Sequence, residues 1–441
     1  MEELEARLHR FAQGGDAVGR CGELVVFVAG GVPGERVKVK LRERHRRYAK
    51  GTVADVLEPS GERVASPCPV FGQCGGCQWQ MLEYGAQLRW KQELVKEALA
   101  RIGGLEDVPV HPVMGMKDPW RYRNKGQHPV STKGARVTAG YYRRGSHEVI
   151  DIDSCPIQHP LVDRVMKAAR RRLERRHIPI YDEATHRGIV RHLVIRASFS
   201  WPQAQLTIVS RTRRAMVALA RQLREDVPEL VSIVQNVNKQ RTNLILGPEY
   251  KTLSGRAWVS ERIRPFVYRL SSSSFFQVNP TQTEVLCREA VDAAALTGTE
   301  RVIDVYAGVG TLSLFMAERA RRVEGVENMA SAVKDARKNV RLNGATNISF
   351  HLGDAGSALG RFDRCDVIVL DPPRKGCDPG ALRAIAALRP RRIVYVSCEP
   401  VTLARDLGRL AEAGYRTEAV QPIDMFPQTY HIECVARVVR A

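Results

Sequence analysis

The chain has 441 residues, 44% of them hydrophobic, and its 68 Lys and Arg against 48 Asp and Glu give a formal net charge of +20. The apolar fraction excludes general disorder, and no run approaches the ~18 apolar residues of a membrane span. The charged start MEELEARLHR lacks the apolar core of a secretory signal, so the cytoplasm is the expected compartment. The positive charge favours a polyanionic partner, nucleic acid above all.

Residues 11–57 predict a small all-β barrel, because short alternating stretches such as ELVVFV and RVKVKL are separated by glycine-rich breaks. The basic run KVKLRERHRRYAK, residues 38–50, breaks up into strands and loops and is a candidate for phosphate contact. Residues 85–103 follow with apolar side chains at helical spacing and a glycine at the end, which predicts a helix.

The next segment, residues 110–264, mixes strand-like runs at 191–197 and 205–209 with helices around 161–176 and 214–224. We interpret it as a central α/β domain. From residue 271 strands and helices alternate regularly, which predicts a doubly wound, mostly parallel sheet. The expected strands are 302–306, 322–326, 348–352, 367–370 and 393–396, and the expected helices are 312–319, 330–342, 379–388 and 402–413.

A cofactor site is predicted at RVIDVYAGVGTLSL, where a buried strand runs directly into Gly308 and Gly310 and a helix follows. Glycines at such a turn let a bound cofactor approach the backbone. Glu327 ends the next strand, where it can accept hydrogen bonds from ribose hydroxyls, and Asp354 follows the third. These features favour a nucleoside-type cofactor, and S-adenosylmethionine fits them.

Two further strand ends carry chemistry: one strand runs into Asp371 of DPPR and the next into Cys398 of SCEP. A thiol beside a methyl donor suits transfer to C5 of a pyrimidine, because thiolate addition at C6 makes C5 nucleophilic. A general base must then remove the C5 proton. Alternatively, Cys398 is a small hydrophobic residue that closes a strand. Glu433 and Cys434 alternate on a late strand, so at most one faces the cleft.

A separate cysteine cluster stands in CPVFGQCGGC, with Cys68, Cys74 and Cys77, and Cys155 of DSCPI lies far downstream. Four thiolates can hold zinc or an iron–sulfur cluster, and their spacing does not separate the two. We interpret the other cysteines as core residues: Cys21, Cys287, Cys365 and Cys377.

In order along the chain, SSSSFFQVNP, DVYAGVGTLSL, DPPRKG, VSCEP and HIECV resemble the RNA 5-methyluridine methyltransferases, most closely the iron–sulfur-containing 23S ribosomal RNA enzymes. The resemblance implies Cys398 as nucleophile and Glu433 as general base. It implies contacts to S-adenosylmethionine from Gln277, Tyr306, Thr311, Glu327 and Asp371. It also implies a 4Fe–4S cluster held by Cys68, Cys74, Cys77 and Cys155.

The resemblance also implies the domain plan: an oligonucleotide-binding-like TRAM barrel in residues 1–58, a central α/β domain with the cluster and an RNA-binding surface in 59–267, and a Rossmann-like class I methyltransferase domain in 268–441. RNA contacts are expected from the YRNK motif, at Arg121, Arg123, Asn124 and Lys125, with Arg191 and His192 as candidates that equally suit a structural strand-end pair.

A TRAM domain together with the cysteine cluster favours 23S ribosomal RNA as substrate, and the same reaction on transfer RNA is the alternative. Two other classes are a non-catalytic RNA-binding protein, against which intact Cys398, Glu433 and Asp371 argue, and a nitrogen methyltransferase, which leaves SCEP unexplained. We expect a monomer with no membrane partner.

Overall fold

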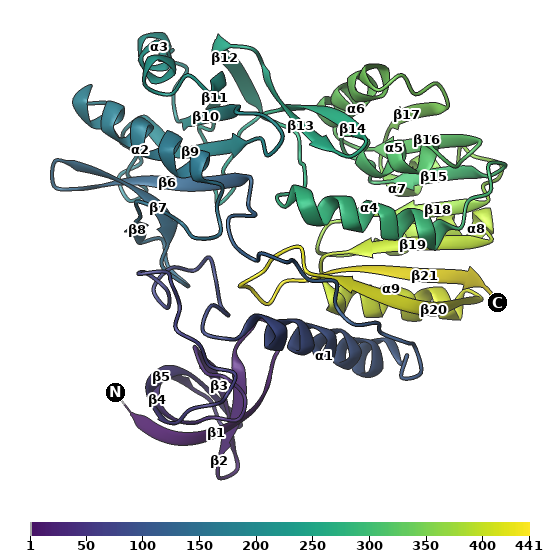
Figure 1. Ribbon diagram of the computed structural model, residues 1–441, viewed down its shortest axis with the longest axis horizontal. Helices are drawn as coiled ribbons and strands as arrows, with labels where there is room; N and C mark the ends of the chain where they lie inside the picture. Colours follow the sequence, from purple (N-terminus) through teal and green to yellow (C-terminus); the bar gives the residue numbers. More distant parts are fainter. Residues whose placement is uncertain (1) are drawn as a thin grey trace. The chain divides into compact units, whose positions relative to one another are not determined.

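The N-terminal strands of the computed structural model, which describes residues 2–441, form a closed barrel in the order β1-β2-β3-β5-β4 (Figure 1). Alternate residues point inward, among them Leu8, Val26 and Val37, each at most 1% exposed. Gly19 is needed because a Cβ there would lie 2.3 Å from the backbone oxygen of Arg7. The strands are β1 Glu3–Phe11, β2 Ala17–Cys21, β3 Leu24–Ala29, β4 Arg36–Arg44 and β5 Tyr48–Glu58.

The barrel core continues into helix α1 (Tyr84–Gly103) and into the loop between β5 and α1, which holds Cys68, Cys74 and Cys77 and is called the cysteine loop below. Trp79 is fully buried, its ring centroid lies 4.5 Å from that of Phe11, and its Nε1 donates to the backbone oxygen of Gly15 at 2.9 Å. The expected helix at 85–103 is therefore confirmed, although its left-handed C-cap is Gly104 at φ 63° rather than Gly103.

Helix α1 packs against α9 (Pro400–Glu412), and the two backbones come close at glycines. A Cβ on Gly408 would lie 3.0 Å from the backbone oxygen of Gly103. The linker after α1 runs beside β20 (Tyr415–Ile423), with bridges from Val110 to Val420 and from Met114 to Ile423. These elements and the barrel belong to one compact unit, unit 1: the chain up to Pro119, Pro373–Gly376 and Ser397–Ala436.

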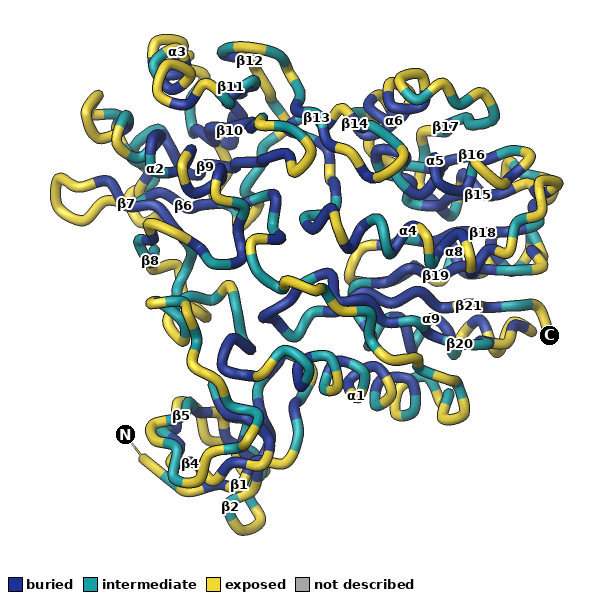
Figure 2. The backbone as a smooth tube through the Cα atoms, in the orientation of Figure 1, coloured by how far each residue is buried: buried dark blue, intermediate teal, exposed yellow. Residues whose placement is uncertain are grey.

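The rest of the chain forms unit 2, Trp120–Pro372, Cys377–Val396 and Arg437–Ala441. Its first sheet has the order β12-β11-β10-β9-β6-β7-β8, and β9 and β10 are buried along their whole length (Figure 2). The strands are β6 Lys125–Lys133, β7 Arg136–Tyr142, β8 Val149–Asp151, β9 Val190–Ala197, β10 Ala204–Ser210, β11 Leu230–Val237 and β12 Glu249–Gly255, with helices α2 Pro160–Arg175 and α3 Val217–Asp226. The hairpin of β13 (Trp258–Ile263) and β14 (Phe266–Ser271) follows.

The second sheet of unit 2 holds parallel strands in the order β17-β16-β15-β18-β19. The chain adds β16 and β17 on one side of β15 and then β18 and β19 on its other side, so the strand order reverses between β15 and β18. This alternation of strands and helices confirms the doubly wound prediction. The strands are β15 Arg301–Val305, β16 Arg322–Glu327, β17 Ile348–Leu352, β18 Val367–Leu370 and β19 Arg392–Ser397. The helices are α4 Pro280–Ala294, α5 Thr311–Ala317, α6 Ala330–Leu342, α7 Ala355–Leu359 and α8 Pro379–Leu388.

The last strand, β21 (Glu433–Arg440), neighbours β20 and begins in unit 1. No helix within residues 2–441 is long and apolar enough to cross a membrane.

Candidate active site

The glycine turn after β15 is shaped for close backbone approach. Gly308 and Gly310 both have positive φ, 55° and 83°, and a Cβ on Gly310 would lie 2.9 Å from the ring of Phe350. One oxygen of Glu327 accepts the backbone N–H of Gly308 at 2.9 Å and the other accepts that of Met329 at 2.8 Å. The carboxylate thus braces the turn while keeping lone pairs for further donors.

Of the other residues expected at the donor site, Tyr306 and Thr311 adjoin this turn in the chain and Gln277 lies earlier. Tyr306 follows β15 at φ 68°, and Thr311 is the first residue of α5. Gln277 lies in the loop before α4, and its backbone oxygen accepts Asn124 Nδ2 at 3.4 Å. Asp354 instead caps α7 by accepting the N–H of Ser357 at 3.2 Å, so its position has a structural explanation.

Two acids flank the point where the strand order reverses. Asp304 is fully buried on β15, and Asp371 directly follows the neighbouring β18. Burial raises the pKa of each carboxyl to about 7, and the charge of Asp304 contributes to the shift at Asp371. Ser313 Oγ donates to Asp304 at 2.5 Å. Ligands of doubly wound sheets bind at such reversal points, and the carboxyl ends of both strands face that edge.

The SCEP turn presents Cys398 two residues before α9, where the helix N-terminus favours a thiolate. Ser397 Oγ accepts the N–H of Glu399 at 3.2 Å, and Thr402 Oγ1 donates to the backbone oxygen of Arg374 at 3.0 Å. These bonds hold the turn against the Pro373–Gly376 loop, which follows Asp371 in the DPPRKG motif.

Cys398 directly follows β19, and Glu433 begins β21, the neighbour of β19 in the sheet. The N–H of Arg440, at the other end of β21, donates to the Arg391 oxygen before β19 at 3.2 Å, so the two strands run antiparallel and the end of β19 lies beside the start of β21. Burial raises the pKa of the Cys434 thiol, and the charges of Glu433, Cys398 and Glu399 raise it further. Glu433 is 2% exposed and Cys434 fully buried, whereas Cys398 is half-buried. The structure therefore brings together the two residues that the sequence assigns to nucleophile and base.

The cysteine loop has some features that suit an inorganic centre. The pKa of the Cys74 thiol is raised by burial and also by the charge of Cys68, and the N–H of Gly76 donates to Cys74 Sγ at 3.4 Å. Cys155 lies in unit 2 and is 9% exposed. Within residues 2–441 no three His, Cys, Asp or Glu side chains are already arranged around a metal position.

Two residues of the YRNK motif hold neighbouring loops, and the other two form no ion pair within the described chain. Arg121 donates to the backbone oxygen of Cys155 at 2.7 Å and pairs with Asp163, so it braces the loop of Cys155. Asn124 holds the loop before α4 through a 2.8 Å bond from its N–H to the Val278 oxygen. In the described chain, Arg123 and Lys125 lie in no ion pair.

Lys125 lies directly opposite Arg196 across the β6–β9 pair. Burial, together with the charges of Arg196 and Arg123, lowers the pKa of the Lys125 ammonium to about 7. Arg196 is 4% exposed, and its Nη1 has no hydrogen-bond partner among the described residues. Arg196 Nη2 donates to the backbone oxygen of Ser274 at 2.9 Å, and the carboxylates of Glu261 and Asp335 partly offset its charge. The remaining positive charge of these desolvated cations suits an anionic ligand. Sequence reasoning missed Arg196, because only strand register places it here.

Arg191 and His192 both make structural contacts, and Tyr142 OH lies 3.4 Å from His192 Nε2. The Arg191 guanidinium donates to the backbone oxygens of Asn238, Gln240 and Thr242 and stacks over the Tyr181 ring at 4.6 Å.

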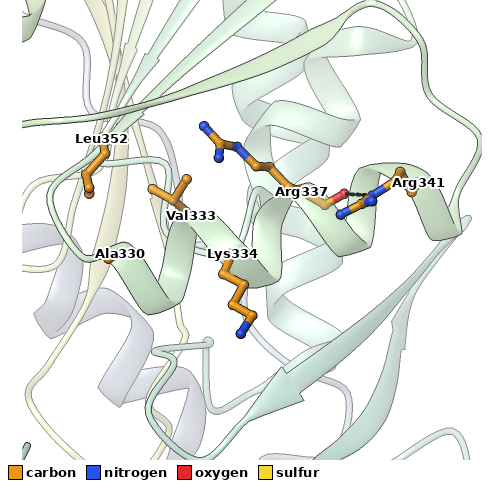
Figure 3. Close-up of a pocket in the computed structure, with 6 residues that line it drawn as sticks. All are labelled: Ala330, Val333, Lys334, Arg337, Arg341 and Leu352. Atoms are coloured by element: carbon orange, nitrogen blue, oxygen red, sulfur yellow. Dashed lines mark hydrogen bonds between the residues drawn. The ribbon is translucent and has the colours of Figure 1, made fainter.

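A surface hollow of about 310 Å³ on α6 holds none of the expected site residues (Figure 3). It is lined by Ala330, Val333, Lys334, Arg337, Arg341 and Leu352.

A parallel sheet that reverses at β15 and β18, a glycine turn after its first strand and an acid at the end of its second define the S-adenosylmethionine-dependent methyltransferases as the class of the fold. Residues 206–440 match the tRNA (uracil-5-)-methyltransferase family, and residues 2–54 match the TRAM domain. The chain belongs to this family and is an RNA (uracil-5-)-methyltransferase with an N-terminal TRAM domain.

Relatives of similar length agree with this assignment. An uncharacterized RNA methyltransferase of Halalkalibacterium halodurans is 44% identical, with 98% of this chain and 96% of that protein covered. One from Clostridium tetani is 42% identical, with 96% and 93% covered. The structure of Pyrococcus abyssi tRNA (uracil-54, C5)-methyltransferase in complex with S-adenosyl-L-homocysteine is similar over 99% of this chain and 100% of that chain, at a TM-score of 0.78 and 25% identity.

Proposed function

We propose that this chain methylates C5 of a uridine in 23S ribosomal RNA through a covalent bond between Cys398 Sγ and uracil C6, and that it works as a monomer in the cytoplasm. The observation that carries the mechanism is that Cys398 directly follows β19 and Glu433 begins β21, its neighbour in the sheet. A nitrogen methyltransferase or a passive RNA-binding protein would need neither a thiol at a helix N-terminus nor a buried carboxylate beside it.

The proposed reaction begins when the Cys398 thiolate adds to C6 and the C5–C6 electrons move into the ring carbonyl as an enolate. When bound, S-adenosylmethionine would supply an electrophilic methyl group: C5 would form the new carbon–carbon bond as the methyl–sulfonium bond breaks and the sulfur leaves as the neutral thioether of S-adenosylhomocysteine. Glu433 then removes the C5 proton, the C5–C6 double bond forms again, and the C6–Sγ bond breaks to restore the thiolate. Asp371, placed at the strand reversal, contacts both the donor and the uracil edge in this proposal.

The donor site proposed here consists of Gln277, Tyr306, Thr311, Glu327 and Asp371. Its fit to a nucleoside rests on the open glycine turn and on the Glu327 carboxylate, which keeps acceptor capacity for ribose hydroxyls. The uridine must leave its stack to reach Cys398, so the cations at Arg123, Lys125 and Arg196 are proposed to hold the RNA backbone.

Two variants test the covalent mechanism, with RNA that carries tritium at uridine C5. Cys398→Ala should release no tritium while still binding S-adenosylmethionine. Glu433→Gln should methylate once and remain joined to the methylated RNA, because the C5 proton stays in place. Normal tritium release by Cys398→Ala would overturn the mechanism, and a Glu433→Gln variant that lets the RNA go would remove Glu433 as base.

The ribosomal substrate rests on the combination of a TRAM barrel with the cysteine loop. The alternative is transfer RNA, on which the Pyrococcus abyssi structural relative acts by its name. Mapping 5-methyluridine in 23S ribosomal RNA and in transfer RNA, with and without the gene, decides between them. Loss of a 23S site supports the proposal, and loss confined to transfer RNA contradicts it.

We also propose a 4Fe–4S cluster held by Cys68, Cys74, Cys77 and Cys155. Three of the four thiols stand in one loop, and the N–H of Gly76 donates to the Cys74 sulfur at 3.4 Å, as it would to a ligand thiolate. When bound, such a cluster offers structural bonding between distant parts of the chain, and no step of the methyl transfer passes through it.

A further inference from the structure

The nine residues 424–432, between β20 and β21, lead directly into Glu433 and have no regular secondary structure. Most of them are nevertheless buried, and Asp424, Met425 and Gln428 are each at most 2% exposed. A buried irregular segment must find partners for its backbone outside a helix or sheet. Here the partners come from the cysteine loop and helix α1, and all of them belong to unit 1.

Gln428 is the point where this segment is held most closely. It has φ 70°, which is unusual for a residue with a side chain. Its backbone oxygen accepts the N–H groups of Gln78 and Trp79 at 3.2 and 3.0 Å, directly after Cys77. Its N–H donates to Gln87 Oε1 at 2.9 Å, and its side-chain Oε1 accepts Gln87 Nε2 at 3.0 Å. Four hydrogen bonds therefore maintain a strained conformation.

A second attachment lies at the start of the segment. Lys91 and Asp424 are both fully buried, and Lys91 Nζ lies 2.5 Å from Asp424 Oδ1 and 3.1 Å from the backbone oxygen of Phe426. Tyr84 OH donates to Asp424 Oδ2 at 2.9 Å. Tyr84, Gln87 and Lys91 are spaced by three and four residues, so they share one face of α1. That face holds residues 424–428, and Gln87 Nε2 also donates to the Trp79 and Leu82 oxygens at 3.1 and 2.8 Å, so the same side chain fixes the cysteine loop.

The remaining steps to Glu433 are short and internally bonded. Thr429 Oγ1 donates to the Phe426 oxygen at 2.8 Å and accepts the N–H of His431 at 3.2 Å. Tyr430 packs on the barrel turn, because a Cβ on Gly15 would lie 2.8 Å from its ring. The backbone that carries Glu433 thus takes its position from the cysteine loop, α1 and the barrel turn.

We propose that Gln87 and Gln428 are positioning residues for Glu433: the α1 face and the backbone after Cys77 set the geometry in which Glu433 removes the C5 proton. This inference rests on the proposed role of Glu433. It gives the N-terminal third of the chain a part in one chemical step, the one that follows methyl transfer. Proton removal depends on carboxylate placement within a fraction of an ångström, whereas all of the proposed donor-site residues belong to unit 2 and lie outside this segment.

The test is Gln87→Leu in the full-length holoenzyme, with Gln92→Leu as matched control. Gln92 lies on the same helix and makes a single amide bond, to the Val110 oxygen at 2.9 Å. Single-turnover reactions would follow methyl incorporation, tritium release from C5 and protein joined covalently to RNA. We expect Gln87→Leu to slow tritium release about tenfold or more with accumulation of the covalent adduct, while methyl incorporation changes less than about twofold. Gln92→Leu should match the wild type.

A merely structural role predicts something different, namely that methyl incorporation and tritium release fall together or that neither changes, and either result overturns the inference. If Gln87→Leu does not fold, Gln428→Gly and Gln428→Ala carry the test. Both lose the side-chain bond, but glycine adopts φ 70° without strain, so Gln428→Gly should release tritium faster than Gln428→Ala. Equal rates would contradict the inference.

The failure of the inference is distinguishable from failure of the proposed function. If Glu433→Gln accumulates the adduct and Gln87→Leu does not, Glu433 remains the base and only the positioning role is lost. If Glu433→Gln accumulates none, the assignment of the base itself fails.

Discussion

The surroundings of a single side chain can change its ionisation in this protein, and Asp304 is the clearest case. Its carboxyl is fully buried, one oxygen accepts from Ser313 and the other has no partner among the described residues. Burial raises its pKa to about 7. The native state therefore holds a proton that the unfolded chain releases near pH 4, and the free energy of unfolding falls as the pH rises from about 4 to 7.

Replacing Asp304 with Asn should remove its share of this pH dependence, while Asp371, whose pKa is also about 7, keeps its own. At pH 8 we expect Asp304→Asn to exceed the wild type in free energy of unfolding by on the order of 2 kcal/mol, and at pH 5 by much less. Urea unfolding of the cofactor-free protein at both pH values measures it. The exposed Asp363→Asn is the control and should behave as wild type. An advantage of equal size at both pH values would show that Asp304 is not protonated in the native state.

A second prediction concerns the ionisation of Lys125 and its effect on RNA affinity. Its pKa of about 7 means that the ammonium is partly neutral in the free protein at physiological pH, whereas an RNA phosphate would favour the charged form. Binding then takes up a proton, and affinity for RNA should fall as the pH rises above 7, by up to about tenfold per pH unit. Filter binding between pH 6.5 and about 8.5 measures this.

In Lys125→Met the affinity should be lower at pH 6.5 and nearly independent of pH. Lys133→Met is the matched control, because Lys133 is exposed at the far end of the same strand. If Lys125→Met keeps the full pH dependence of the wild type, another group is responsible.

At the scale of elements, the cysteine loop joins three parts of unit 1. It supplies Trp79 to the barrel core and two backbone N–H groups to Gln428, and it leads into α1. The loop forms no helix or strand, and around the cysteines its backbone makes short turns such as the Phe71 N–H to the Cys68 oxygen at 3.1 Å. A bound inorganic centre would supply the cross-links that such a loop lacks.

The metal content tests this element. Protein purified without oxygen should be brown and contain about four irons per chain. Cys74→Ser should lose most of the iron, while Cys21→Ser, in barrel strand β2, should keep it. A colourless protein with one zinc would refute the cluster assignment, and so would full iron content in Cys74→Ser.

At the scale of the whole molecule, only some of the cations behind the net charge of +20 are outside ion pairs. In the basic run of the barrel, Lys38 pairs with Glu3 and Lys50 with Glu43. Arg46 and Arg47, in the exposed turn between β4 and β5, lie in no ion pair within the described chain. Counterion release upon RNA binding should therefore depend on a few unpaired arginines more than on the total charge.

The salt dependence of RNA binding measures this. The double variant Arg46→Ala/Arg47→Ala should reduce the slope of log affinity against log salt by roughly 1 to 1.5. Arg221→Ala/Arg288→Ala removes the same charge from arginines that pair with Glu225 and Glu284, and it should leave the slope nearly unchanged. Equal loss of slope in both variants would mean that net charge alone governs binding.

Much of the fold was predictable because its signals are local. Strand and helix periodicity placed β17, β18, α6 and α8 at the bounds that the structure has, and the motif order identified the family. The helix α4 was not predicted, although Asn279 and Pro280 form a good start signal for it. The division at residues 58 and 267 remains a prediction, because the compact units of the structure are discontinuous in sequence.

The sequence by itself determined the class of fold, the glycine turn and the residue types of the reaction, since each depends on neighbours within a few positions. Only the tertiary structure decided which distant groups meet. Arg196 reaches Lys125 through strand register, and Gln428 meets Gln87 across 341 positions of sequence. No local pattern marks such pairs, because burial and hydrogen bonding between them exist only once the chain has folded.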